Sequence, residues 1–248
     1  KFPDAVQLVN EQCGFFDARE VQSAPVKQKE TPKAEFLLPV RFQNNKRVTA
    51  YLLSRGIDMA ILDYCFQHGL LYEAADYHNA VFVGYDGKTP RYATLRGTLS
   101  GNGFKRDVTG SSKQFCFSIT GKGNGKLNVF ECAIDALSYL TQVKMQGADW
   151  RQESVLSLGG VYKSTPNEVP KVPVALQGYL NAHADVCEIV LRLDNDAVGR
   201  GAASAISQAI TNLPVSVELP ADGKDYNEWL MRQKGISPRP RARNEPER

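Results

Sequence analysis

The clearest pattern along the chain is an alternation of short apolar runs with longer amphipathic segments between residues 127 and 234. The apolar runs predict strands and the amphipathic segments predict helices. Strands are expected at 127–130, 155–158, 189–193 and 215–219, and helices at 134–145, 173–182 and 202–213. Such alternation is typical of a parallel sheet with helices on its faces.

Upstream of residue 127 the pattern changes. Residues 47–126 predict a smaller α+β subdomain, with helices at 48–54 and 58–67 and strands at 80–85, 92–96 and 114–119, separated by turns that contain glycine. Residues 1–20 predict a short amphipathic helix. Residues 21–46, rich in Lys, Gln, Pro and Glu, predict a linker, and residues 235–248 a disordered tail or linker.

Composition limits the compartment, the metal and the partners that we expect for the protein. No apolar run approaches the roughly 20 residues that cross a bilayer, so we expect no membrane partner. The five cysteines are scattered and odd in number, which fits the reducing cytoplasm. Because the three histidines are isolated and no Cys-x-x-Cys pair occurs, we expect no zinc site within this chain. The net charge of +3 is by itself weak support for a nucleic-acid partner.

Acidic side chains follow three of the four expected parallel strands, at the sheet edge where function collects. Glu131 and Asp135 follow the first strand, Asp194 and Asp196 the third, and Asp222 and Asp225 the fourth. Two carboxylates about 4 Å apart repel by about 4 kcal/mol at an effective dielectric of 20. Because Mg²⁺ binds such carboxylates together with phosphates, the pattern indicates metal-assisted phosphate chemistry. The alternative is an Asx-turn between a strand and a helix.

Two other phosphate-handling patterns fit less well. Asp194-Asn195-Asp196 is similar to the haloacid-dehalogenase phosphatase motif, but that family places its nucleophile on the first strand and uses an acidic pair downstream that this sequence lacks. Residues 121–126 resemble a glycine-rich phosphate loop. They lack its spacing and precede a strand, so a hairpin turn is the better interpretation.

Three short motifs together resemble the Toprim domain, which is shared by bacterial primases, type IA and type II topoisomerases, RecR-like repair proteins and some nucleases. They are Glu131-Cys132-Ala133-Ile134-Asp135, Asp194-Asn195-Asp196 with Gly199-Arg200, and Gly223-Lys224-Asp225. The primase motifs are the most similar, reading roughly Glu-Gly-x-x-Asp, Asp-x-Asp-x-Ala-Gly-Arg and Gly-Lys-Asp-x-Asp-Glu.

The resemblance covers most of the chain and implies its organisation. Residues 127–234 would form a Toprim α/β domain, a Rossmann-like, mainly parallel sheet flanked by helices. Residues 47–126 resemble the amino-terminal half of the primase catalytic core, and residues 1–20 the helical end of an upstream zinc-ribbon domain. The similarity is greatest to primase-like Toprim proteins of plasmids and conjugative elements, which place a poorly characterised domain ahead of the Toprim.

The resemblance also implies residue roles. Glu131 would act as general base or acid for the 3′-oxygen, while Asp194, Asp196, Asp225 and Asp135 would hold Mg²⁺ or Mn²⁺. Arg200 would contact a nucleotide phosphate, or is simply a residue of the helix surface. Four basic residues would line the path of a single-stranded DNA template, or form a solvated loop: Arg96, Lys105, Arg106 and Lys113.

Two departures from the primase motifs leave retention of catalysis open. Cys132 replaces a glycine, and Asn227 replaces an acid, which keeps an oxygen ligand but loses a charge. Three functions therefore remain: a primase-like nucleotidyltransferase, a Toprim nuclease or strand-passage module, and a non-catalytic DNA-binding module of a mobile-element protein. The expected partners are single-stranded DNA, nucleotides, and a helicase or relaxase of the same element.

Overall fold

The structure is a computed structural model that describes residues 35–99, 103–123, 125–161 and 169–237. The helix and zinc-ribbon end expected within residues 1–20 lie outside the described residues, as do most of the predicted linker and tail. Within the described ranges, no helix combines the length and apolar character needed to cross a membrane.

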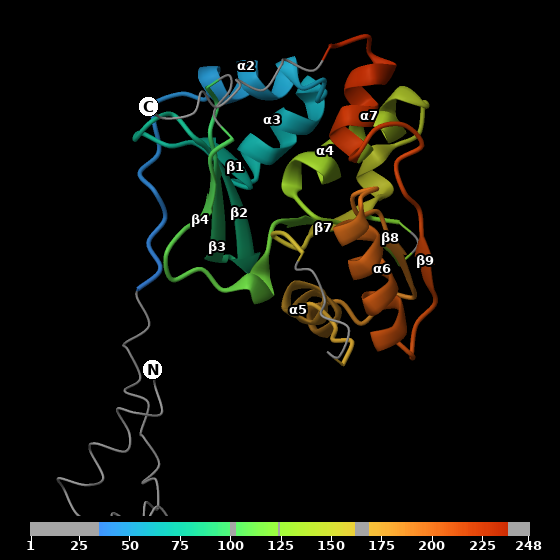
Figure 1. The fold of residues 1–248 in the computed structure, drawn as a ribbon. Coiled ribbons are helices and arrows are strands. Elements are labelled where there is room, and N and C mark those ends of the chain that lie inside the picture. The colour runs from blue at the N-terminus through green and yellow to red at the C-terminus, as the bar shows by residue number, and fades with distance from the viewer. Residues whose placement is uncertain (1–34, 100–102, 124, 162–168, 238–248) are drawn as a thin grey trace, which may run out of the picture. The chain divides into compact units, whose positions relative to one another are not determined.

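The second half of the chain forms a five-stranded sheet in the order β5-β7-β6-β8-β9 (Figure 1). Its strands are β5 (Ser118–Ile119), β6 (Lys126–Phe130), β7 (Ser154–Ser157), β8 (Glu188–Leu191) and β9 (Val215–Val217). All neighbours are parallel except β5, which is antiparallel to β7 at the edge. Leu127 of β6 lies opposite Ile189 of β8. The predicted, mainly parallel sheet is thereby confirmed.

Helices cover both faces of this sheet. They are α4 (Ala133–Met145), α5 (Val174–Ala182), α6 (Ala197–Ala209) and α7 (Tyr226–Gln233). Because strand side chains alternate between faces, Phe130 packs in a core cluster with α4 and α7, whereas Leu127 and Val129 pack in another with α5 and α6. Most of α4 is buried, since it lies between the sheet and the helices of the first half.

The first half of the described chain forms an antiparallel sheet in the order β1-β2-β3-β4 with two helices. The elements are α2 (Lys46–Ser54), α3 (Met59–Gln67), β1 (Leu71–Glu73), β2 (Ala80–Asp86), β3 (Thr89–Arg96) and β4 (Lys105–Asp107). Asp58 begins α3 by accepting a hydrogen bond from the Ala60 N–H at 2.8 Å. The expected helical pair and the two longer strands are therefore present.

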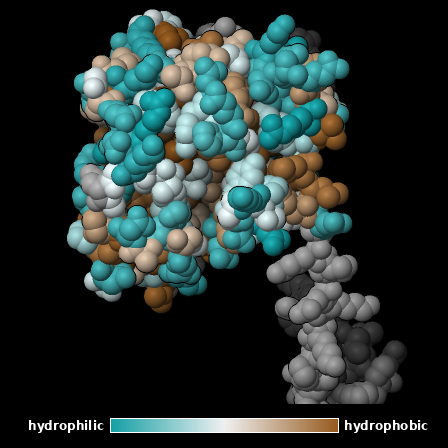
Figure 2. Space-filling model, turned by 180° about the vertical axis from the view of Figure 1, so that it is seen from behind, coloured by the Kyte–Doolittle hydropathy of each residue, from teal (hydrophilic) through white to brown (hydrophobic). Residues whose placement is uncertain are grey.

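Part of the segment predicted as a linker packs onto this antiparallel sheet. Phe36 and Leu38 contact the cluster formed by Tyr72 and its neighbours, while Leu37 and Val40 are exposed. Residues 36–38 thus alternate as in an extended chain with one side facing the sheet, and the alternation ends before Val40. On the face shown in Figure 2, hydrophilic side chains predominate, and apolar ones gather where the described chain begins.

The strand predicted at 114–119 is only partly right. A 3₁₀ turn spans Lys113–Phe115, and the two residues of β5 pair with β7, so they join the parallel sheet instead of the antiparallel one. The reason is a close approach of backbones. A Cβ on Gly84 of β2 would lie 1.7 Å from the Phe115 carbonyl oxygen, so the chain crosses β2 here and does not pair with it.

Hydrogen bonds fix the α2–α3 turn onto α4 and α7. Asp58 accepts from the Lys144 ammonium at 2.7 Å and donates from its backbone to Thr141 Oγ1 at 3.1 Å. From α7, the Asn227 side chain donates to the Arg55 carbonyl at 2.9 Å. The two halves of the described chain thus share polar contacts as well as a core cluster.

Candidate active site

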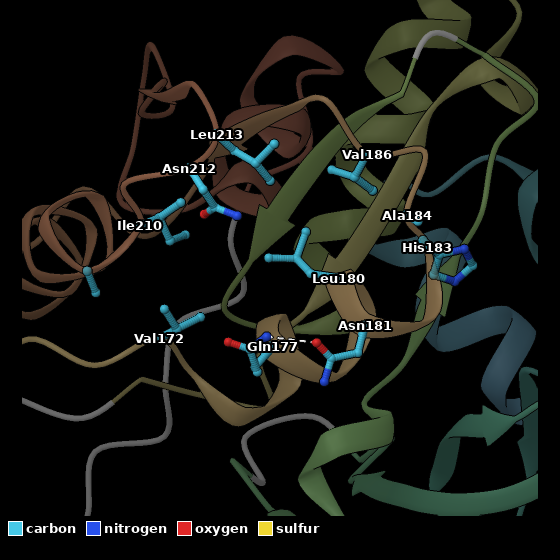
Figure 3. Close-up of a pocket in the computed structure, with 11 residues that line it drawn as sticks. Val172, Gln177, Leu180, Asn181, His183, Ala184, Val186, Ile210, Asn212 and Leu213 are labelled. Carbon is cyan, nitrogen blue, oxygen red and sulfur yellow. Dashed lines mark hydrogen bonds between the residues drawn. The ribbon is translucent and has the colours of Figure 1, made fainter.

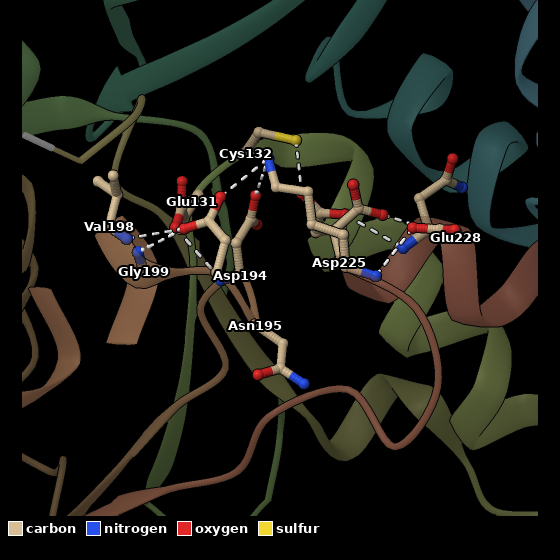
Figure 4. Close-up of polar contacts among 12 residues, drawn as sticks. Glu131, Cys132, Asp194, Asn195, Val198, Gly199, Asp225 and Glu228 are labelled. Carbon is tan, nitrogen blue, oxygen red and sulfur yellow. Dashed lines mark hydrogen bonds and ion pairs between the residues drawn. The ribbon is translucent and has the colours of Figure 1, made fainter. Parts of the chain in front are cut away.

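The acidic side chains gather at the carboxyl edge of the parallel sheet. Glu131 follows β6 and Asp194 follows the neighbouring strand β8, so both leave the sheet at the same edge. The Asp194 N–H donates a hydrogen bond to Glu131 Oε1 at 3.2 Å (Figure 4). The parallel pairing of β6 and β8 is therefore what brings these two acids together.

A lysine side chain bridges the Asp194-x-Asp196 pair. Lys224 Nζ lies 3.1 Å from Asp194 Oδ2 and 3.1 Å from Asp196 Oδ2. Hydrogen bonds to Asp196 and Asp194 raise the pKa of Lys224 above its usual value. Lys224 therefore remains a cation and offsets the repulsion between the two carboxylates.

Asp196 also begins helix α6. Its Oδ1 accepts hydrogen bonds from the Val198 and Gly199 N–H groups, both at 2.9 Å (Figure 4). The backbone hydrogen bond from Gly199 makes the largest contribution to a pKa below the usual value for Asp196. The Asx-turn named as an alternative thus exists, as the cap of α6, and it uses one carboxylate oxygen while the other faces Lys224.

The electrostatic setting of Glu131 differs from that of Asp196. Burial, and then the charge of Asp194, raise the pKa of Glu131 to about 7. Burial also raises the pKa of Asp194, against the opposing effect of Lys224. A carboxyl with a pKa near 7 exchanges its proton readily at neutral pH, which suits a general acid or base.

Asp135 and Asp225 form a deeper group beside the first. Asp135, in the first turn of α4, is buried and accepts hydrogen bonds from Cys132 Sγ at 2.8 Å and the Asn227 N–H at 3.1 Å. Burial raises its pKa, and the charge of Asp225 adds to this. Asp225 begins α7 by accepting from the Glu228 N–H at 2.7 Å (Figure 4). The charge of Asp225 also contributes to the raised pKa of Asp194, and the charge of Asp194 to that of Asp135.

The oxygen atoms of the acidic site are of the chemical type that binds a hard divalent cation. Over the described ranges, no three His, Cys, Asp or Glu side chains are already arranged to hold a metal ion. The groups offered by Glu131, Asp194 and Asp196 are nevertheless all carboxylates, the ligands that Mg²⁺ and Mn²⁺ prefer. The Lys224 ammonium already occupies a cation position between two of them.

Asn227, which replaces an acid of the primase motif, has a structural role. It is 1% exposed, and its Nδ2 donates to the Arg55 carbonyl and to Ser138 Oγ, both at 2.9 Å. Its Oδ1 has no hydrogen-bond partner among the described residues. The side chain links α7 to α4 and to the α2–α3 turn.

Two of the expected basic residues, Lys113 and Lys105, lie near the glycine turn after β7. Lys113 Nζ donates to the Gly159 carbonyl at 3.2 Å, and Lys105 Nζ would lie 3.7 Å from a Cβ on Gly160. The Gly160 N–H donates to the Glu131 carbonyl at 2.9 Å. Arg96 is partly buried and donates to the Tyr51 hydroxyl. The negative charge of Asp135 is among the causes that raise the pKa of Arg96.

The other two expected basic residues are placed differently. Arg106 follows Lys105 in β4, so its side chain points to the opposite face of that strand. Arg200, in the first turn of α6, is exposed and donates from Nη1 to Asn195 Oδ1 at 2.5 Å.

Sequence reasoning missed two residues of the site, Lys224 and Gly199. Lys224 was part of a quoted motif, and the need for a cation beside two carboxylates was the available signal. Gly199 lies so close to the acids that a Cβ there would be 2.1 Å from the Asp194 carbonyl oxygen and 2.9 Å from Glu131 Oε1. The glycine three residues after Asp196 marked this approach.

A separate hollow lies at the other edge of the sheet. It has a volume of about 370 Å³ and is lined by residues of α5, of the turn before β8, and of the segment between α6 and β9 (Figure 3). Its lining is mainly apolar and amide, with His183 at one end, and contains no acidic residue. It is not part of the acidic site.

Two family models match the chain. Residues 128–230 match the family described as Toprim-like, and residues 50–123 match the family described as "Protein of unknown function (DUF3991)". The chain therefore carries a Toprim-like domain preceded by a DUF3991 domain, and the resemblance found in the sequence is confirmed. No curated protein matches the chain significantly.

Primases are among the solved structures to which the chain is similar. The primase fragment of the bacteriophage T7 primase-helicase protein is 16% identical, with 74% of this chain and 69% of that one covered and a TM-score of 0.49. The E. coli primase catalytic core is 13% identical, with 76% of this chain and 69% of that one covered and a TM-score of 0.48. The Aquifex aeolicus primase is 13% identical, with 95% of this chain and 64% of that one covered and a TM-score of 0.45. With these scores, the fold assignment rests on the family match and the strand order.

Two glycines of α6 provide a test of the site's packing. Gly199→Ala should lower the free energy of unfolding by about 1–3 kcal/mol, because the added methyl group collides with the Asp194 carbonyl. Gly201→Ala, where no atom lies within 4 Å of the added Cβ, should raise it by up to about 1 kcal/mol. Urea denaturation of both variants measures these changes in the free energy of unfolding. Equal effects would show that the close approach at Gly199 is wrong.

The buried Asn227 generates a second prediction. Asn227→Asp should destabilise the fold by about 2–4 kcal/mol at pH 7, because a carboxylate would be buried there without the donor to the Arg55 carbonyl and beside that carbonyl's negative end. Burial raises the pKa of the new carboxyl, so the loss should shrink as the pH falls and it is protonated. Asn212→Asp, at an exposed position, is the control. If Asn227→Asp left the free energy of unfolding unchanged, that result would contradict the structural role of Asn227.

Proposed function

We propose that this protein acts on nucleic acid as a primase-like nucleotidyltransferase that extends a primer on a single-stranded DNA template. One observation carries the proposal: Glu131, with a pKa near 7, lies beside the Asp194–Lys224–Asp196 cluster at the carboxyl edge of a Toprim-like domain. The similarity of the three acidic motifs to those of primases supports primer synthesis over cutting.

Each residue has a role in this proposal. Glu131 accepts the proton of the attacking 3′-hydroxyl, because its carboxylate is partly shielded from water and becomes basic near neutral pH. Asp194 and Asp196, with Asp225 and Asp135 close by, would hold the Mg²⁺ or Mn²⁺ that Toprim domains generally bind. The ion, when bound, supplies the positive charge that phosphoryl transfer requires.

Basic residues beside the acids give a polyanion a path to the site. An acidic group alone repels a nucleic acid, so cations must flank it. Lys105 and Lys113 lie at Gly160 and Gly159, and Gly160 is hydrogen-bonded to Glu131. In this proposal the template approaches along this side, Arg96 belongs to the same path, and Arg200 of α6 contacts a nucleotide phosphate.

The proposal extends to the biological setting through the resemblance to primase-like proteins of mobile elements. Primer synthesis of this kind serves the replication or transfer of a plasmid or conjugative element in the cytoplasm. A helicase or relaxase of the same element is the expected protein partner, since unwinding supplies the single strand that a primase copies.

Glu131→Gln tests the chemical step. In a primer-synthesis assay with the intact protein, single-stranded DNA, labelled ribonucleotides and Mg²⁺ or Mn²⁺, this variant should lose activity by about 10²-fold or more, because the proton acceptor is gone. DNA binding should be unchanged. Glu188→Gln, at the amino end of β8 and so at the opposite edge of the sheet, is the matched control. DNA cleavage without synthesis would favour a nuclease. Binding without either activity would favour a DNA-binding module.

Lys105→Ala tests the template path. The variant should bind single-stranded DNA more weakly, and the slope of log affinity against log salt should flatten by about 0.7, as expected for one lost phosphate contact. Arg106→Ala removes the same charge from the opposite face of β4 and should have a smaller effect. Equal losses in the two variants would mean that net charge, and not a path beside Gly160, governs binding.

A further inference from the structure

Lys224 stands where the proposed metal ion would stand. Its ammonium makes 3.1 Å ion pairs with both Asp194 and Asp196. Of the two partners, Asp194 has a side chain that is only 14% exposed, so water shields its charge poorly. A neutralising cation is therefore needed even when no metal is bound, and Lys224 supplies it.

The main chain of Lys224 is held in place independently of its side chain. Its N–H donates to Glu228 Oε2 at 2.8 Å, and its carbonyl accepts from the Asn195 N–H at 2.7 Å. Glu228 is in turn held by Arg232 at 2.5 Å. These contacts keep Lys224 beside the acids when its ammonium is not paired with them.

The side chain of Lys224, in contrast, is half exposed to water. Its exposed fraction is 50%, and in the part of the chain that the structure describes its ion pairs are with Asp194 and Asp196. A lysine side chain has a flexible four-carbon stem and a compact, strongly hydrated head, so rotation into water costs little once another cation takes over the carboxylates. A fixed backbone and a flexible, half-exposed side chain are the two features that would let the ammonium leave the carboxylates and return to them.

We propose that Lys224 is a displaceable counter-ion, whose ammonium occupies the cation position between Asp194 and Asp196 until a divalent ion expels it. The proposal rests on the proposed function, because it concerns the same carboxylates. A divalent ion binds carboxylate oxygens at about 2.0–2.1 Å and repels a neighbouring ammonium, so the two cations exclude each other from these oxygens. Lys224 therefore keeps the metal-free site stable and lowers its affinity for metal.

Lys224→Met separates these two effects. Calorimetric titration of the full chain should show that the variant binds Mn²⁺ roughly fivefold or more tightly than the wild type, because one competing charge is gone. Without metal the variant should melt at a lower temperature, because Asp194 and Asp196 then repel each other. Saturating Mn²⁺ should raise its melting temperature more than it raises that of the wild type.

Three further variants complete the experiment. Lys224→Arg keeps the charge and should retain an affinity near that of the wild type. Lys144→Met removes a cation that pairs with Asp58, outside the acidic site, and should leave Mn²⁺ binding unchanged. Lys224→Gln, which keeps a hydrogen-bond donor without charge, takes the place of Lys224→Met if the latter does not fold, with the same expected gain in affinity.

The outcomes distinguish this inference from the proposed function. If the wild type binds Mn²⁺ and the neutral variant binds it equally or more weakly, displacement is overturned while the metal site stands. If neither protein binds Mn²⁺, the metal of the proposed function fails, and the inference fails with it. Tighter binding by the neutral variant, with a wild-type affinity in Lys224→Arg, supports both.

Discussion

Negative charge concentrated at one edge of a parallel sheet is the constraint on which this site depends. Strands β6 and β8 are neighbours and parallel, so Glu131 and Asp194 must leave the sheet side by side. Their repulsion is offset by a lysine that lies about thirty residues further along the chain than Asp194. The loop and helix that carry this lysine must therefore be fixed relative to the sheet, and much of the surrounding packing serves that requirement.

A buried polar network beneath the site meets this requirement. Arg192, directly after β8, donates from Nε to Asn128 Oδ1 at 2.8 Å and from Nη1 to the Tyr226 hydroxyl at 2.9 Å. Its guanidinium also lies 4.4 Å from the ring centre of Tyr139 in α4. Tyr226 is the first residue of α7, two positions after Lys224. One arginine thus joins β6, α4 and α7, so that the start of α7 is set relative to both central strands.

The sequence predicted the strands of the parallel sheet and the acids at their ends because both follow from local patterns of apolar and charged residues. It did not predict what depends on distant contacts. Helix α7 is a short helix of eight residues, half of them polar, and its place is set by contacts with Arg192 and with the Arg55 carbonyl from other elements. The pairing of β5 depends on how closely Gly84 approaches Phe115. The direction of the Lys224 side chain depends on a sheet edge formed by other segments.

The contacts between the DUF3991 domain and the Toprim-like domain bear on the site itself. Asn227 donates to the Arg55 carbonyl, and Lys234 donates to the Gly56 carbonyl at 2.6 Å, so both ends of α7 are held by the α2–α3 turn. Since Lys224 and Asp225 immediately precede α7, whatever moves that turn also moves the cation that neutralises the acids. Lys105 of the same domain lies beside Gly160, whose N–H is bonded to the Glu131 carbonyl. The acids themselves all belong to the Toprim-like domain, and the first domain contributes to the geometry and the charge around them.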